Sequence, residues 1–255
     1  GDYFGVSVDI DGAYAVVGAH AAMVNGEGNR GTAYVFTADS ANPSADWIQV
    51  GEGFDPLGAD GGDYLGARVA ISGDTIVVGT SQSAPAYGDA YVFSRQSSGE
   101  WLQAAKLIPG DGAGGDRFGA AVAIEENLIV VGAPYHDDSR GKIYLYRPDP
   151  ASPDGSWTQS GPPLMQPDAA SYAFFGQSIS VSGDHLLVGS RGGSADSYGN
   201  ASVFIQDASG GWLYSGYTLS PSDGVDGGNF GWSVVIDGSH AVVGAIGDDM
   251  YAPME

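Results

Sequence analysis

The strongest constraint on the fold is a repeat of about 55 residues that occurs five times, the fifth time only in half. Its first line pairs an aromatic residue or leucine with glycine, at successive spacings of 61, 53, 57 and 55 residues. A second, valine-rich line ending in glycine always follows at the same distance, so both lines belong to one unit of fixed geometry. The two lines are Phe4-Gly5, Leu65-Gly66, Phe118-Gly119, Phe175-Gly176 and Phe230-Gly231, and Val16–Gly18, Val77–Gly79, Val130–Gly132, Leu187–Gly189 and Val242–Gly244.

Two further lines complete the first four copies. A third line begins with glycine and carries aromatic residues, and a tryptophan marks a fourth. In the first line, apolar Val6, Val8 and Ile10 alternate with polar Ser7 and Asp9, which is the period of a half-buried strand. The four lines therefore predict four strands per repeat. The last two lines are Gly31–Phe36, Gly88–Phe93, Gly141–Tyr146 and Gly199–Phe204, and Trp47, Trp101, Trp157 and Trp212.

These strands predict an all-β fold, a β-propeller of four-stranded antiparallel blades with four complete repeats and half of a fifth. No helical period is present in the sequence. A β-helix turn is much shorter than this repeat, and a β-sandwich would not show one pattern repeated in phase. We expect a single domain over residues 1–255, with repeats of about 1–61, 62–114, 115–171, 172–226 and 227–255.

Tight turns are expected between the first two strands of each repeat. Four copies place glycine there, which supplies the positive φ of a hairpin turn. The third copy has Glu125-Glu126-Asn127 instead, and we expect Asn127 to take the left-handed conformation. The glycine turns are Asp11-Gly12, Ser72-Gly73, Ser182-Gly183 and Asp237-Gly238.

Composition excludes several classes of partner. The chain has 9 Lys and Arg residues against 31 Asp and Glu residues, a net charge of −22, which disfavours nucleic acid and anionic membrane surfaces. There is no cysteine, so disulfides and thiolate-bound metals are excluded. No apolar stretch reaches the roughly 20 residues of a membrane span, and we expect no membrane insertion.

The Phe-Gly line followed by Val-Val-Gly-Ala resembles the FG-GAP repeat. Gly132-Ala133-Pro134 matches the GAP element fully, and Gly18-Ala19 and Gly244-Ala245 match two of its three residues. Gly79-Thr80 and Gly189-Ser190 depart further. The resemblance implies the seven-bladed propeller of integrin α-subunits and many bacterial surface proteins, in its short-hairpin bacterial form. It also implies an extracellular or cell-surface location.

Calcium is the one cofactor that the resemblance raises, because integrin-type repeats often carry a calcium loop between the two motifs. Here that hairpin is a turn of about two residues, and Asp9 and Asp11 come nearest to a ligand set. Calcium takes 6–8 oxygen ligands, so both are weak candidates. Acidic, glycine-rich linkers between repeats add further weak candidates. These are Asp111, Asp116, Asp223 and Asp226.

Ligand binding is expected at one rim of the propeller. Loops from the second to the third strand, and from the fourth strand to the next repeat, share that rim, and they vary most in length and content. Tyrosines beside carboxylates there suit sugar rings and hydroxyl groups, or a protein ligand. The candidate residues are Tyr135, His136, Asp137, Asp138, Arg140, Asp196 and Tyr198.

Catalytic signals are poor. No Gly-x-Ser-x-Gly elbow, His-Glu-x-x-His motif or phosphate loop occurs, and the four histidines are scattered. His185 and His240 are expected at the start of second strands, as surface or packing residues. We expect no enzyme activity. Asn200-Ala201-Ser202 is a glycosylation sequon if the protein is secreted by a eukaryote.

The fifth repeat stops after its second strand, which predicts an open blade edge. Three explanations stay open: a longer chain with flanking domains, strands donated by a partner or a second copy, or a stable open arc. The sequence favours an extracellular adhesion or recognition module that binds a protein or a carbohydrate. The alternatives are a structural subunit of an extracellular filament, joined by strand pairing at that blade, and an ancillary domain of a secreted enzyme.

Overall fold

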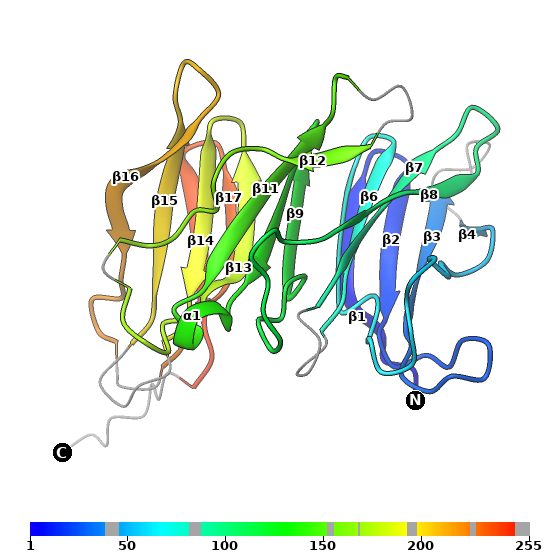
Figure 1. Ribbon diagram of the computed structural model, residues 1–255, viewed down its shortest axis with the longest axis horizontal. Helices are drawn as coiled ribbons and strands as arrows, with labels where there is room; N and C mark the ends of the chain where they lie inside the picture. Colours follow the sequence, from blue (N-terminus) through cyan, green and yellow to red (C-terminus); the bar gives the residue numbers. More distant parts are fainter. Residues whose placement is uncertain are drawn as a thin grey trace. The chain divides into compact units, whose positions relative to one another are not determined.

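The structure is a computed structural model that describes residues 1–38, 46–81, 88–151, 156–167, 169–192, 198–224 and 228–247. Its strands form four sheets of four antiparallel strands and one of two (Figure 1). The first sheet is β1 (Phe4–Asp11), β2 (Tyr14–Ala19), β3 (Thr32–Ala38) and β4 (Trp47–Val50). The second is β5 (Arg68–Ser72), β6 (Thr75–Gly79), β7 (Ala90–Arg95) and β8 (Trp101–Leu107).

The third sheet is β9 (Ala121–Glu125), β10 (Leu128–Ala133), β11 (Lys142–Pro148) and β12 (Trp157–Gln159). The fourth is β13 (Phe175–Ser182), β14 (His185–Ser190), β15 (Asn200–Gln206) and β16 (Trp212–Leu219), followed by the pair β17 (Phe230–Asp237) and β18 (His240–Ala245). Each fourth strand begins at a tryptophan of the repeat. The all-β prediction of four-stranded propeller blades and a half blade is therefore confirmed.

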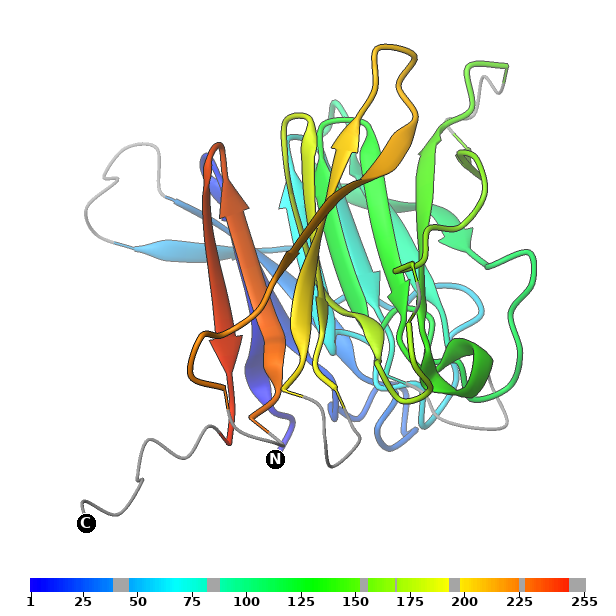
Figure 2. The ribbon, with the colours of Figure 1, turned by 90° about the vertical axis from the view of Figure 1, so that its left-hand side faces the viewer.

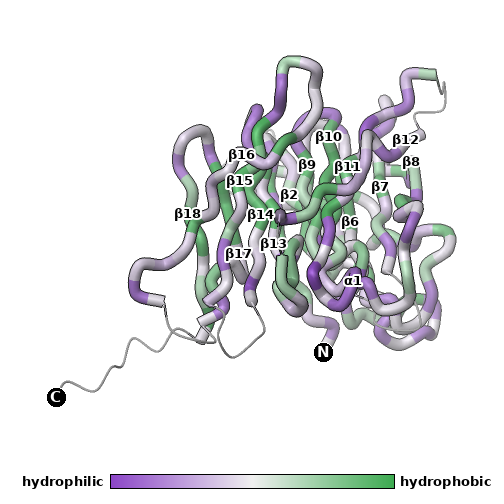
Figure 3. Tube along the Cα trace, turned by 60° about the vertical axis from the view of Figure 1, so that its left-hand side comes forward, coloured by the Kyte–Doolittle hydropathy of each residue, from purple (hydrophilic) through white to green (hydrophobic). Residues whose placement is uncertain are grey.

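The residues form two compact units. The first comprises Gly1–Val131 and Leu145–Ser160, and the second comprises Gly132–Tyr144 and Gly161–Glu255. In the second unit the β17–β18 pair lies beside β13 and β14, as the orange and yellow ribbons of Figure 2 show. Apolar residues concentrate in second strands such as β10 and β14, which Figure 3 colours green. None of the helices in the described ranges is long and apolar enough to span a bilayer.

The Phe-Gly pair lies in a β-turn, and in the first, fourth and fifth repeats it also begins the first strand. In every repeat the residue before the pair accepts a hydrogen bond, through its carbonyl, from the backbone N–H three positions later, as in Val6 N to Tyr3 O at 3.2 Å. The glycine is third in this turn and has a φ near +88°, as in Gly5. A positive φ at the third position is the requirement of a type II turn, which glycine meets without strain. The equivalent bonds are Ala67 N to Tyr64 O, Ala120 N to Arg117 O, Gln177 N to Phe174 O and Trp232 N to Asn229 O.

The same glycine also packs against the neighbouring blade. A Cβ at Gly66 would collide with the carbonyl oxygen of Thr32, and a Cβ at Gly18 would collide with the carbonyl of Gly66. In the second unit a Cβ at Gly231 would likewise collide with the carbonyl of Asn200. The glycines of the repeat therefore mark points where the backbones of adjacent blades touch.

Side chains of one first strand bind the backbone of the next first strand. Ser7 Oγ accepts a hydrogen bond from Val69 N at 3.0 Å, and Asp9 Oδ2 accepts one from Ile71 N at 2.8 Å. In the second unit, Ser180 Oγ accepts from Ile236 N at 3.0 Å. The alternating polar residues of the first strand therefore join blades, and this role explains their place in the repeat. Further bonds of this kind are Gly73 N to Asp11 Oδ2, Glu126 N to Ser72 Oγ and Gly238 N to Ser182 Oγ.

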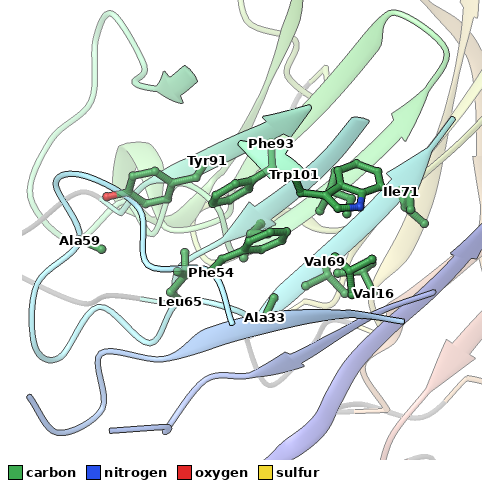
Figure 4. Close-up of a cluster of buried hydrophobic side chains, with 13 residues drawn as sticks. Val16, Ala33, Phe54, Ala59, Leu65, Val69, Ile71, Tyr91, Phe93 and Trp101 are labelled. Carbon is green, nitrogen blue, oxygen red and sulfur yellow. The ribbon is translucent and has the colours of Figure 1, made fainter. Parts of the chain in front are cut away.

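Apolar side chains fill the space between adjacent sheets. In the first unit, the rings of Phe54 and Phe93 stack with centroids 3.9 Å apart, and Trp101 lies beside them (Figure 4). In the second unit, Leu187, Ala201 and Ile236 form a smaller core. Phe93 of a third strand and Trp101 of a fourth strand therefore pack between sheets in the first unit.

One local expectation from the sequence was wrong. In the turn of the third repeat, Glu126 takes the left-handed φ of 51°, not Asn127. Glu126 occupies the position that glycine holds in the other turns, so hairpin length sets the backbone geometry, whatever the residue. The α1 segment, His136–Ser139, is a single turn of four residues with non-helical φ and ψ at Asp137 and Asp138, and it agrees with the absence of a helical period in the sequence.

Candidate functional site

The two loop sets meet at one rim within each unit. In the first unit, Leu65 N donates to Arg30 O at 2.9 Å. In the second unit, Phe175 N donates to Arg140 O at 3.1 Å. Each bond joins a loop after the second strand to the linker that enters the next blade. The rim expected from the repeat register is therefore present in both units.

The rim of the first unit is centred on His20. Its ring stacks on Tyr3 with centroids 5.1 Å apart and lies 5.8 Å from the ring of Tyr64. Burial lowers the pKa of His20, and the positive charge of Arg68 lowers it further. Nearby, the guanidinium of Arg30 binds two carboxylates. Its Nη1 donates to Glu27 Oε2 and its Nη2 to Asp55 Oδ1, both at 2.6 Å.

The rim of the second unit is built on strained backbone. Asp137, Asp138 and Ser139 have φ of 51°, 53° and 61°, values uncommon outside glycine. Carbonyls of this turn hold the linker, because Tyr172 N donates to Asp138 O at 3.1 Å and Phe174 N donates to Ser139 O at 2.8 Å. Such strain persists only where the surroundings enforce it, and it gathers at functional sites.

Arg191 lies against this turn. Its guanidinium carbon is 3.8 Å from the ring centroid of Phe174 and 5.7 Å from that of Trp232. Arg191 Nη2 donates to the hydroxyl of Tyr135 at 3.4 Å, and the rings of Tyr135 and Phe174 meet edge to face at 4.9 Å. We name Tyr135, Phe174, Arg191 and Trp232 the Arg191 cluster. It joins four separate segments of the chain into one surface.

The structure brings most of the predicted rim residues together. Tyr135, His136, Asp137, Asp138 and Arg140 share the α1 loop, where Arg140 Nη1 pairs with Asp137 Oδ2 at 3.1 Å. Asp137 and Asp138 are exposed, and α1 is hydrophilic in Figure 3.

The other two rim candidates are placed differently. Tyr198 is 46% exposed, and its carbonyl accepts a hydrogen bond from Phe230 N at 2.8 Å. The ring of Tyr198 lies near Gly224. Asp196 lies outside the described residues.

Asp9 and Asp11, the hairpin calcium candidates, are engaged by backbone amides. Asp9 Oδ1 accepts from its neighbour Ile10 N, and Asp9 Oδ2 accepts from Ile71 N. Asp11 Oδ2 accepts from Gly73 N at 2.7 Å. Burial raises the pKa of Asp9, although both amide bonds oppose this effect. These contacts give both carboxylates a role in joining the first two blades.

The linker candidates are dispersed. Asp116 is buried, and its Oδ2 accepts from Ala113 N at 2.7 Å, which closes the turn on itself. Asp111 and Asp223 are exposed, and Asp226 lies outside the described residues. No group of three or more His, Asp or Glu side chains suited to a metal ion occurs within the described ranges. Calcium binding by these residues remains a prediction from the sequence.

The remaining candidates are isolated polar residues. Asn200 begins β15 with its Oδ1 buried, and Ser202 of the sequon is fully buried. His185 begins β14 beside Asp184, with Nδ1 and Oδ1 2.6 Å apart, and His240 begins β18 on the surface. Both histidines lie where the sequence predicted them.

Sequence reasoning missed a hollow in the first unit. It has a volume of about 510 Å³ and lies between the segment after β4 and the β7–β8 hairpin. Its lining includes the aromatic residues Phe93 and Trp101 and the acidic residues Glu52 and Glu100. Sequence reasoning also missed Phe174 and Trp232 as site residues. Their signal was available, since one precedes a Phe-Gly pair and the other directly follows one.

Comparisons with known proteins agree with this architecture. A family model described as the FG-GAP repeat matches residues 1–36, 56–93, 101–146, 157–204 and 217–253. No curated protein sequence matches the chain.

Solved structures resemble this chain at low sequence identity. A fucose-specific lectin from Aleuria aurantia is 13% identical with a TM-score of 0.50, over 93% of this chain and 68% of the lectin. An endo-arabinase from Bacteroides thetaiotaomicron is 12% identical with a TM-score of 0.45, over 92% of this chain and 89% of the enzyme. A Bombyx mori β-fructofuranosidase is 13% identical with a TM-score of 0.48, over 91% and 51%. The likeness to the lectin concerns the fold alone.

Proposed function

This chain belongs to the FG-GAP repeat family, and on that premise we propose that it is a recognition module that binds a protein or a glycan through its propeller rim. We place it outside the cell or on the cell surface, as a single non-catalytic domain. The family supports this location, because the repeat is found in integrin α-subunits and many bacterial surface proteins.

The observation that carries the proposal is the surface formed by the α1 loop and the Arg191 cluster. It combines exposed carboxylates, a guanidinium and partly exposed aromatic rings on backbone held in strained conformations. Rigidly held loops of this composition are typical of binding surfaces. The propeller fold of a fucose-specific lectin is compatible with a sugar ligand on such a rim.

The absence of catalysis is also proposed from the placement of titratable groups. Two of the three histidines of the second unit, His185 and His240, stand at hairpins on the opposite rim from the α1 loop, and His136 lies in that loop. The rim carboxylate of Asp137 is paired with Arg140, not with a nucleophile. This arrangement suits binding better than proton transfer.

Binding to glycan and purified-protein arrays tests the proposal. We expect the chain to bind a defined subset of ligands, and a Tyr135→Ala, Asp138→Ala variant to lose at least tenfold in affinity. The matched control changes Asp184 and His185 to alanine on the opposite hairpins, and it should bind like the unmodified chain. Equal binding by all three proteins would exclude the rim, and no binding to any array would contradict a recognition role.

A second candidate function is assembly with other copies or partners through the exposed faces of β1 and of the β17–β18 pair. We propose it from the exposed apolar side chains of these strands. Val8 and Ile10 of β1 are 65% and 61% exposed, and Val235 and Val242 of β17 and β18 are 53% and 66% exposed. Apolar rows of this kind favour association. We expect light scattering to show oligomers that a Val235→Asp, Val242→Asp variant loses. A monomer at high concentration would rule this role out.

A further inference from the structure

Building on the proposed recognition function, we propose that the rim of the second unit binds a sugar that carries one carboxylate, with Arg191 as its receptor. Arg191 is half-buried, and the rings of Phe174 and Trp232 lie within 3.8 and 5.7 Å of its guanidinium carbon. The Tyr135 hydroxyl accepts from Nη2 at 3.4 Å. Rings and hydroxyl together fix the guanidinium before any ligand arrives.

Arg191 has no carboxylate partner among the described residues, which distinguishes it from four other cationic side chains. Arg30, Arg95 and Lys106 of the first unit all pair with carboxylates, as does Arg140 in the α1 loop. The chain has 31 acidic residues, yet this arginine stacks on aromatic rings and pairs with no described carboxylate. Its guanidinium is therefore available to bind an anionic ligand. The free N–H groups lie in the guanidinium plane, away from the ring faces.

A carboxylate is the anion that fits this geometry. A planar guanidinium donates two parallel hydrogen bonds to the two oxygens of one carboxylate. Arg191 keeps four of its five N–H donors after the bond to Tyr135. Stacking on Phe174 shields part of the charge from water, which strengthens a charge-assisted bond.

A sugar is favoured over an acidic peptide because exposed aromatic rings flank the arginine. Trp232 is 37% exposed and Tyr172 is 57% exposed, with its ring 6.3 Å from that of Phe174. Such rings offer flat apolar surfaces to the C–H face of a pyranose, while Asp137 and Asp138 offer acceptors for hydroxyl groups. The net charge of −22 repels polyanions at long range, so one carboxylate is favoured over many.

Titration calorimetry of the 255-residue chain tests the proposal, with methyl glucuronoside as the probe and methyl glucoside as its neutral counterpart. We expect the glucuronoside to bind at least tenfold more tightly. Arg191→Met should abolish this preference, and Arg191→Lys should reduce it at least threefold, because lysine keeps the charge but not the planar fork. Arg95→Met, which removes a paired arginine in the first unit, is the matched control. Circular dichroism and amide NMR spectra establish that each variant is folded.

Three results would overturn the proposal: no glucuronoside binding, equal binding of both sugars, or an unchanged preference in Arg191→Met. N-acetylglutamate amide binding as tightly as the glucuronoside would replace the sugar by an acidic peptide and would also overturn it. The broader recognition function has a separate test, since binding of neutral sugars or proteins that depends on Tyr135 would support it even if the glucuronoside fails. If array binding is lost in the Tyr135 variant but kept in Arg191→Met, the recognition function is supported and the role of Arg191 as a carboxylate receptor is not.

Discussion

The rims of the two units use equivalent positions of the repeat for different chemistry. His20 and Arg191 each stand two residues after the glycine of the second line, and Tyr3 and Phe174 each precede a Phe-Gly pair. In the first unit His20 stacks on Tyr3 with Tyr64 tilted nearby, and Arg30 is bound by two carboxylates. In the second unit Arg191 stacks on Phe174 and has no acid partner in the described part of the chain.

The difference shows that the backbone and the side chains of the rim determine different properties. The type II turn and the glycine contacts fix where these positions lie in both units. The side chains at these positions then determine whether the cationic groups of the rim pair with carboxylates of the chain or remain available to bind a ligand. Equivalent substitutions in the two rims should therefore agree where they disturb the backbone and differ where they change side chains.

The largest effect is expected from the shared backbone. Gly66→Ala should lower the free energy of unfolding by about 4 kcal/mol, because the new Cβ meets the Thr32 carbonyl and φ is strongly positive. Gly231→Ala should destabilise the second unit similarly. Gly5→Ala has the same φ but open space around it, and should cost only about 1 kcal/mol. Urea denaturation checks all three, and equal costs for Gly5 and Gly66 would exclude blade contact as the cause.

The next effect separates the two rims at one repeat position. Phe174 is 7% exposed and Tyr3 is 66% exposed. Phe174→Ala should cost about 3 kcal/mol, as for a buried aromatic residue, whereas Tyr3→Ala should cost less than about 1 kcal/mol. Thermal and urea unfolding measure both. A larger cost at Tyr3 would reverse the assignment of the buried position.

A smaller effect concerns the paired arginines. Arg30→Met should lower the free energy of unfolding by about 1 kcal/mol or less, because its two carboxylate partners are partly solvent-exposed. Arg140→Met loses only the Asp137 pair and should cost less still. High salt should weaken the difference between the two variants. Costs above about 2 kcal/mol would show that these pairs anchor the rim.

The smallest effect is a pH dependence confined to the first rim. The folded pKa of His20 lies below its ordinary value of 6.5, so the folded chain binds its proton less readily than the unfolded chain does. Stability from this residue is present above pH 6.5 and is lost as pH falls through that value toward the folded pKa. Melting temperatures from pH 7.5 to 5 should fall less steeply in His20→Gln. An NMR titration of His20 with a pKa above 6.5 would contradict the burial effect.

Much of the fold could be predicted because the same strand pattern occurs in four complete copies of the repeat. The constant distance from Phe4 to Val16 specifies a hairpin, and Trp47 and its equivalents mark the fourth strands. Individual residues were harder to assign. Glu126 takes a left-handed φ because its turn has a fixed length, a constraint that residue preference at Asn127 did not reveal.

The site was predicted less completely, because it depends on contacts between distant loops. The sequence identified Tyr135 and its neighbours as a rim loop, since they follow a second strand. It did not reveal that Phe174 would stack on Arg191, because packing alone brings these segments together. Asp9 was selected for its charge, whereas its contacts with backbone amides give it a part in joining blades.

The bonds from the first strand to the next blade bear on how such chains can grow. Ser7, Asp9 and Ser180 accept hydrogen bonds from backbone amides, a group that every residue except proline possesses. A blade therefore recognises its successor without requiring any particular side chain there. Duplicated or exchanged repeats can be accommodated at once, with the rim residues left to diverge. A proline at a position such as Ile71 or Ile236 would remove the donor of this bond.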